Sequence, residues 1–113
     1  MTRCAILSIG DEVVDGRIVD ANARWLAAAA RELGLDVHEH ACVVDDRGAI
    51  VQAITRLAGG ARHILTTGGL GPTPDDLTRF AALDLLGEEE LVEDDAARAE
   101  VEAWCARRGL PAS

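Results

Sequence analysis

The sequence contains no lysine, no tyrosine and few aromatic side chains. All 11 basic residues are arginines, which excludes both a Walker-type phosphate loop, since that needs Gly-Lys-Ser/Thr, and a lysine Schiff base. The aromatic residues are Trp25, Phe80 and Trp104, too few to favour stacking on nucleic-acid bases. We therefore expect an aliphatic core and expect both tryptophans to pack on helix faces.

Positive charge is scarce, and so are long apolar runs. The chain of 113 residues has 11 basic and 20 acidic residues, which gives a formal net charge of −9. A protein of this charge gains no free energy from counterion release on binding nucleic acid. The same charge argues against binding to an anionic membrane surface. The longest apolar run, 25–30, is too short to cross a bilayer. We predict small-molecule partners bearing phosphate, and neither nucleic-acid nor membrane binding.

Cysteine pairs of the Cys-x-x-Cys type are absent. Cys4, Cys42 and Cys105 are odd in number and far apart, which predicts free thiols, a cytoplasmic location, and core packing for Cys4 and Cys105. His38, His40 and Cys42 alternate along a predicted strand, where neighbours on one face lie about 6.5–7 Å apart. That spacing is too wide for three ligands of one metal ion, so we interpret them as an exposed or edge-strand face.

Short apolar runs alternate with helical patterns along the chain. Strands are predicted over 4–9, 37–44 and 63–67. The first two helices are predicted over 22–33 and from 45–48 to 58. A third helix is predicted from the end of the 66–78 loop to about 86, and a last one over 97–108 after an acidic stretch at 88–95. This alternation predicts one α/β domain over 1–113, with a mainly parallel sheet between helix layers and ligands at the carboxyl ends of the strands. Three strands are few, so the α/β/α sandwich looks incomplete at its carboxyl end.

The strongest local signal follows the third predicted strand, in a loop rich in glycine and proline. Its glycines can take positive φ and approach a ligand closely: Gly68, Gly69 and Gly71. We expect Thr73 or Asp75 to cap the next helix, whose first amides would then bind phosphate or pyrophosphate. The alternative is an ordinary strand-to-helix turn with no ligand.

Carboxylates follow each of the three predicted strands, as the pairs Asp11 and Glu12, Asp45 and Asp46, and Asp75 and Asp76. Six carboxylates at one edge repel each other unless a cation is bound or their pKa values are raised. Mg²⁺ is typically held by one or two carboxylates together with phosphate oxygens. The sequence therefore favours a metal and phosphate site, although each acid singly fits a helix cap or a solvated charge.

Three segments together resemble a known family: TTGGLGPTPDDLT at 66–78, IGDEVVDGRIVDANARWL at 9–26, and Val-Asp-Asp at 44–46. They are similar to the amino-terminal domain of the CinA (competence/damage-inducible) family, within the molybdenum-cofactor or MoCF superfamily that includes MogA and MoaB. The resemblance implies an α/β fold, homo-oligomers and a site at the carboxyl edge of the sheet. Family domains continue with further strands beyond the point where this chain stops, and full-length CinA proteins add an amidohydrolase domain.

The resemblance also implies residue roles and an activity. Asp45 and Asp76 would hold Mg²⁺ or another divalent cation. In the mechanism that we expect from this, Asp75 is the third catalytic residue and orients the attacking water. Pterin phosphate or nucleotide pyrophosphate would be bound by residues of the first and third loops: Asp11, Gly16, Thr67, Gly68, Gly69, Gly71 and Thr78. Leu70 and the Pro74-Asp75 pair favour the CinA branch, which implies Mg²⁺-dependent hydrolysis of ADP-ribose-type pyrophosphates. The alternatives are a non-catalytic pterin- or nucleotide-binding module, with molybdopterin as its ligand, and a molybdopterin adenylyltransferase.

Overall fold

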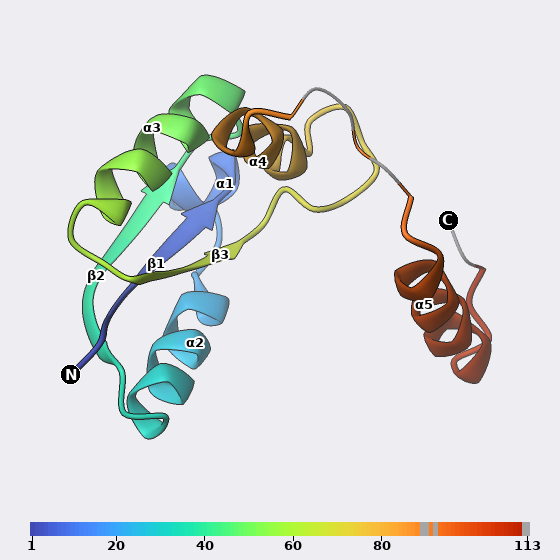
Figure 1. Ribbon diagram of the computed structural model, residues 1–113, viewed down its shortest axis with the longest axis horizontal. Helices are drawn as coiled ribbons and strands as arrows, with labels where there is room; N and C mark the ends of the chain where they lie inside the picture. Colours follow the sequence, from blue (N-terminus) through green and yellow to red (C-terminus); the bar gives the residue numbers. More distant parts are fainter. Residues whose placement is uncertain (89–90, 92, 112–113) are drawn as a thin grey trace.

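A sheet of three parallel strands forms the centre of the domain. In the computed structural model, which describes residues 1–88, 91 and 93–111, strand β1 (Arg3–Ile9) lies between β2 (Asp36–Val43) and β3 (His63–Thr67) (Figure 1). Every residue of β1 after Arg3 is buried, as expected of a central strand covered on both faces. The predicted parallel α/β sheet is thus confirmed, with no fourth strand among the described residues.

Helices cover both faces of this sheet. Helix α2 (Ala21–Glu32) lies on one face, and α3 (Arg47–Ala58) and α4 (Thr78–Leu86) lie on the other (Figure 1). The main core forms on the α3 side from alternate residues of β1 and the facing helices: Ala5, Leu7, Ile9, Ile50, Leu57 and Ala81. Because side chains alternate along a strand, Ser8 of β1 points toward the α2 side.

Aspartates fix the starts of α2 and α3, the helices that follow the loops after β1 and β2. Asp20 Oδ1 accepts a hydrogen bond from the Ala23 amide at 3.1 Å, and Asp46 Oδ2 accepts one from the Ala49 amide at 2.8 Å. These bonds satisfy amides that have no partner within the helix, so Asp20 caps the amino end of α2 and Asp46 caps that of α3. The segment after β1 also contains a single helical turn, α1 (Asp11–Val14), which the sequence reading treated as loop.

The expected cap of α4 was wrong. Leu77 occupies the N-cap position, and no side chain caps the helix. Thr73 instead uses both its amide and its hydroxyl to donate to the Asp76 carboxylate within the loop. The loop therefore closes on itself before the helix begins.

Helix α5 (Asp95–Arg107) stands apart from the sheet and its covering helices (Figure 1). Arg98 pairs with Glu93 at 2.6 Å and with Glu102 at 2.9 Å.

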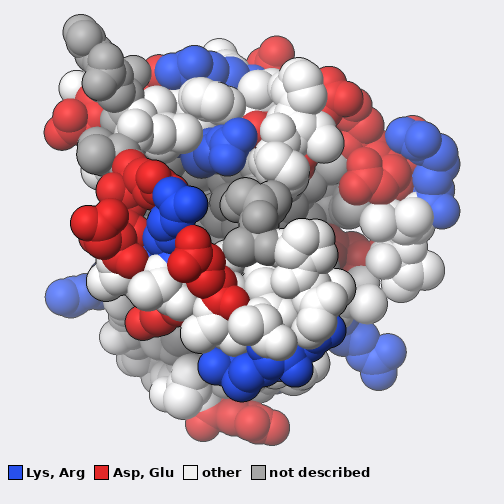
Figure 2. Space-filling view, turned by 90° about the vertical axis from the view of Figure 1, so that its right-hand side faces the viewer, with Lys and Arg blue, Asp and Glu red and all other residues white. Residues whose placement is uncertain are grey.

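On the face shown in Figure 2, acidic and arginine side chains are interspersed, with no continuous basic surface among the residues described there. The predicted acidic stretch at 88–95 includes residues 89, 90 and 92, which lie outside the described residues.

The two tryptophans correct the sequence reading. Trp25 is 69% exposed and Trp104 46% exposed, so neither is packed away as expected. Helix α2 buries the small side chains of Ala23 and Ala30 against the sheet, and Trp25, two positions after Ala23, falls on the opposite side of the helix. Trp104 lies under the Arg108 guanidinium, 4.0 Å from the ring centre.

The cysteines follow the prediction. Cys4 and Cys105 are buried, Cys42 is exposed, and all three are free thiols. Within the described residues, no helix is both long and apolar enough to cross a bilayer.

Candidate functional site

The loop after β3 runs directly against the end of β1. Gly68 has φ +98° and Gly69 has φ +70°, conformations that favour glycine. A Cβ on Gly68 would overlap the carbonyl oxygen of Ile9, and one on Gly69 would overlap the Thr78 hydroxyl, both far inside the 3.0 Å that real Cβ contacts keep. Glycine is thus required at positions 68 and 69 by contact with the protein's own chain, whether or not a ligand approaches the loop.

Thr78 fastens this loop to the start of α4. It is buried, its hydroxyl donates to the Gly68 carbonyl at 2.7 Å, and its amide donates to the Gly69 carbonyl at 3.2 Å. The Thr78 hydroxyl proton is therefore used in a hydrogen bond that holds the loop glycines in place. The implied role of Thr78 in phosphate binding stays a prediction.

Carboxylates from all three strand ends gather at the same edge of the sheet. Burial raises the pKa of Asp45, and the negative charges of Asp11, Glu12 and Asp76 raise that pKa further, against a lowering hydrogen bond from the Asp11 backbone. The Asp45 amide donates to Asp11 Oδ1 at 3.0 Å, which ties the loop after β2 to the loop after β1. Asp45 therefore faces negative charge from both neighbouring loops, an arrangement that a divalent cation would stabilise.

Asp76 has the opposite environment. Hydrogen bonds from the Thr73 hydroxyl, and from the Gly71 and Thr73 amides, lower its pKa, and the Arg79 charge lowers it further, while desolvation opposes them. The Asp76 carboxylate is thus held ionised in its own loop while Asp45 is pushed toward protonation. Two neighbouring acids with pKa values displaced in opposite directions are typical of sites that handle metals and protons.

The raised pKa of Asp45 predicts a gain in stability on neutralisation. Because folding favours the protonated form, the ionised carboxylate costs stability at pH values above the folded pKa and costs nothing below the unfolded one. We expect Asp45→Asn to raise Tm at neutral pH by about 2 °C, a small effect because the group is partly solvated. Thermal unfolding followed by circular dichroism should show this difference vanishing near about pH 3. An unchanged or lower Tm at neutral pH would contradict it.

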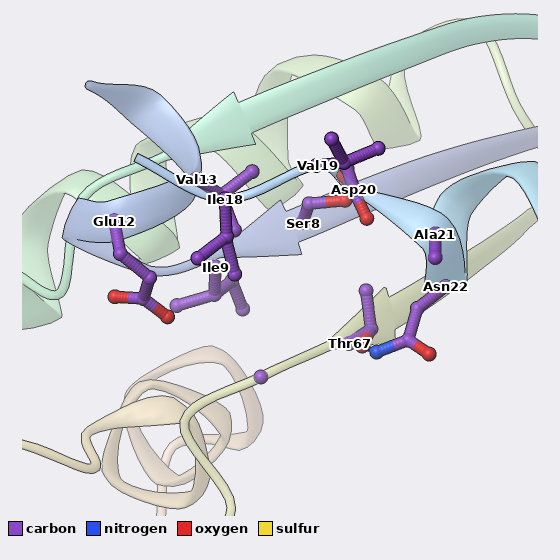
Figure 3. Close-up of a pocket in the computed structure, with 11 residues that line it drawn as sticks. Ser8, Ile9, Glu12, Val13, Ile18, Val19, Asp20, Ala21, Asn22 and Thr67 are labelled. Atoms are coloured by element: carbon purple, nitrogen blue, oxygen red, sulfur yellow. Dashed lines mark hydrogen bonds between the residues drawn. The ribbon is translucent and has the colours of Figure 1, made fainter. Parts of the chain in front are cut away.

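A pocket of about 160 Å³ opens beside these groups on the α2 side of the sheet (Figure 3). Its polar lining includes Ser8, Glu12, Asp20, Asn22 and Thr67. Asn22 Nδ2 donates to Thr67 Oγ1 across the pocket at 3.4 Å. This volume suits a phosphate-sized group, since whole drug-sized ligands occupy pockets of about 300 Å³ or more.

The pocket both includes and omits predicted site residues. Thr67 and Gly68 line it, whereas Asp11 and Gly16 do not. Gly16 lies in the turn after α1, where its amide donates a hydrogen bond to the Val13 carbonyl at 3.3 Å. Asp75 is exposed. Ser8, Asp20 and Asn22 line the pocket without having been predicted as site residues. The Asp-x-Asn at the start of a predicted helix is a sequence signal for two of them.

Comparison with known proteins assigns the chain to a family. A family model described as a probable molybdopterin binding domain matches residues 5–109, a range that includes the glycine loop and all six edge carboxylates. The chain belongs to this family.

The family's relatives include CinA-like proteins. One from Geobacter sp. (strain M21) is 47% identical over 87 residues, which cover 77% of this chain and 21% of that protein. Another, from Thermomicrobium roseum, is 46% identical over 105 residues, covering 93% of this chain and 26% of the relative. The chain thus spans about a fifth to a quarter of the length of these relatives.

Solved structures agree on the fold. The protein CinA from Thermoplasma acidophilum superposes with a TM-score of 0.81 at 27% identity, over 96% of this chain and 62% of that one. The molybdopterin biosynthesis enzyme MoaB from Thermus thermophilus gives a TM-score of 0.72 at 28% identity, over 80% of this chain and 58% of that one. The chain therefore has the α/β fold of these CinA and MoaB structures.

Proposed function

We propose that this domain binds the phosphate groups of a nucleotide or pterin and, with a divalent cation, hydrolyses ADP-ribose-type pyrophosphates. The observation that carries the proposal is the placement of Asp45, which faces Asp11, Glu12 and Asp76 beside a loop of glycines. Neither feature alone would indicate a site, because glycines and first-turn acids are common where strands meet helices.

The donor set fits a hard divalent cation such as Mg²⁺. Asp45 and Asp76 supply carboxylate oxygens, the ligands Mg²⁺ prefers, and the electrostatic strain on Asp45 is the kind that such an ion relieves. When bound, the ion supplies charge neutralisation and polarisation of the phosphoanhydride. Asp45 and Asp76 are the residues proposed to hold it.

The chain's own groups would perform the remaining steps. Backbone amides of the 68–71 loop bind phosphate oxygens and absorb the charge that grows on them during reaction. The exposed Asp75 carboxylate accepts the proton of the attacking water. The water oxygen bonds to one phosphorus, and the bridging P–O bond of the anhydride breaks.

The test is product formation from ADP-ribose, with AMP and ribose 5-phosphate separated by chromatography. We expect both products with Mg²⁺ and neither when the metal is chelated, in this chain and in the full-length CinA-like protein of Thermomicrobium roseum. Binding of ADP-ribose by both proteins without any product would overturn the hydrolase proposal in favour of a binding module.

The similarity to MoaB from Thermus thermophilus, described as a molybdopterin biosynthesis enzyme, favours a second candidate. This is transfer of an adenylyl group from ATP to the phosphate of molybdopterin, with release of diphosphate. The same loop and carboxylates would serve it. Diphosphate release that depends on added molybdopterin, with ADP-ribose left intact, would favour this function over hydrolysis.

A further inference from the structure

Three side chains with metal-binding atoms meet at the α2 side of the sheet, away from the ligands proposed for Mg²⁺. His40 Nε2 lies 3.1 Å from Asp20 Oδ2 and 3.9 Å from Cys42 Sγ. All three ligand atoms lie within 4.8 Å of one another. His40 and Cys42 are contributed by edge strand β2, and Asp20 by the N-cap of α2.

These separations match those around one tetrahedral ion. Zinc bonds of about 2.0–2.1 Å to nitrogen or oxygen and about 2.3 Å to sulfur place neighbouring ligand atoms roughly 3.3–3.6 Å apart. The observed 3.1 Å and 3.9 Å bracket that range. His40 and Cys42 are exposed, so their side chains have room to adjust toward that geometry.

Both oxygens of the Asp20 carboxylate are fixed in position by the groups around them. Its Oδ1 accepts the Ala23 amide that begins α2, and Oδ2 faces His40. Burial alone would raise the pKa of Asp20, but hydrogen bonds from Ser8, the Ala23 amide and His40, with the charge of His40, lower it overall. Asp20 is therefore an ionised, oriented ligand at neutral pH.

We propose that Asp20, His40 and Cys42 bind a zinc-class divalent ion at a site distinct from the Asp45 and Asp76 carboxylates. A donor set of one imidazole, one thiolate and one carboxylate is typical of Zn²⁺ and Co²⁺, whereas Mg²⁺ takes oxygen ligands. Three protein ligands leave the fourth position for water or for the Ser8 hydroxyl, which lies 3.0 Å from His40 Nε2. Ser8 and Asp20 also line the phosphate-sized pocket (Figure 3), so the ion would lie beside it.

The expected exposed face of an edge strand is confirmed, because His38, His40 and Cys42 are all exposed on β2. Backbone spacing does separate alternate residues, but the side chains of His40 and Cys42 converge, and Asp20 joins them from a distant segment. His38 is not part of the group, because its ring lies toward Cys4, with Nδ1 3.2 Å from the Cys4 carbonyl oxygen.

Metal binding at this site should release a proton from Cys42. Burial raises the pKa of the Cys42 thiol, and the Asp20 charge raises it further, while only the thiolate binds metal.

The test is titration of the protein with Co²⁺ in the presence of excess Mg²⁺. We expect one ion per chain, visible absorption bands of tetrahedral Co²⁺, and a near-ultraviolet charge-transfer band from thiolate sulfur. Cys42→Ser should abolish the charge-transfer band. His40→Gln and Asp20→Asn should each weaken binding by about 100-fold, the upper end of the loss seen when even an outer-shell partner of a ligand is removed.

Matched variants separate binding by these three ligands from binding elsewhere on the chain. Cys105→Ser and His38→Gln remove a thiol and a ring outside the group and should leave the titration unchanged. Asp20→Asn retains the helix cap, since asparagine is as good an N-cap as aspartate, so it decides the matter if His40→Gln fails to fold. Co²⁺ bound without a thiolate band, or bound equally by Cys42→Ser and Asp20→Asn, would overturn the proposal and leave a hydrogen-bonded His40–Asp20 pair in its place.

Discussion

Replacement of Gly68 by alanine should unfold the domain or lower its free energy of unfolding by at least about 3 kcal/mol. The cost has two sources: φ of +98° is unfavourable for any residue with a Cβ, and the Cβ would overlap the carbonyl oxygen of Ile9. Ile9 ends the central strand and contributes to the main core, so the backbone there has little freedom to move aside.

Denaturant unfolding followed by circular dichroism measures this effect. Gly34→Ala is the matched control, because Gly34 also has positive φ, +82°, but nothing lies within 4 Å of its added Cβ. We expect it to cost only about 1 kcal/mol, the conformational part alone. Equal losses in the two variants would show that the loop does not press against β1.

The second large effect concerns activity. In the ADP-ribose assay, Asp45→Asn and Asp76→Asn should each lower kcat/KM by at least about 100-fold, because removing a charged ligand weakens both cation binding and transition-state stabilisation. Asp45→Asn should do so while slightly raising Tm, since its charge is unfavourable in the folded protein without a cation. If the Asp45 charge lowers the stability of the fold but supports turnover, its role is in function and not in folding.

Asp36→Asn is the control for these variants. Asp36 begins β2 at the amino end of the strand, on the opposite edge of the sheet from the gathered carboxylates. It should retain full activity, and the two site variants should regain little at high Mg²⁺ concentration. Turnover by Asp45→Asn equal to that of the unsubstituted chain would remove Asp45 from the mechanism.

The architecture was predictable because local patterns and global topology agree. The strand at 63–67 occurs as predicted, and the strand predicted at 37–44 is shifted by one residue, to Asp36–Val43. Once strands and helices alternate, a parallel sheet follows, and its carboxyl edge must collect the acids that follow each strand. The gathering of Asp11, Asp45 and Asp76 needed no tertiary information beyond that rule.

The errors arise where the outcome depends on side-chain direction. Trp25 has the large, apolar side chain of a core residue. Ala23 and Ala30, however, occupy the face of α2 that contacts the sheet, so Trp25 is exposed. The Thr73 hydroxyl is a suitable helix cap, but it donates instead to the Asp76 carboxylate in the same loop. The meeting of His40 with Asp20 joins residues that are 20 positions apart, which strand periodicity alone does not reveal.

Calorimetric titration of the domain with ADP-ribose, with and without Mg²⁺, is the most direct measurement of whether a cation joins the gathered carboxylates to a phosphoanhydride. We predict measurable affinity with the metal and at least about a hundredfold weaker binding without it, with the metal dependence lost in Asp45→Asn. Equal affinity with and without Mg²⁺ would contradict the electrostatic basis of the site.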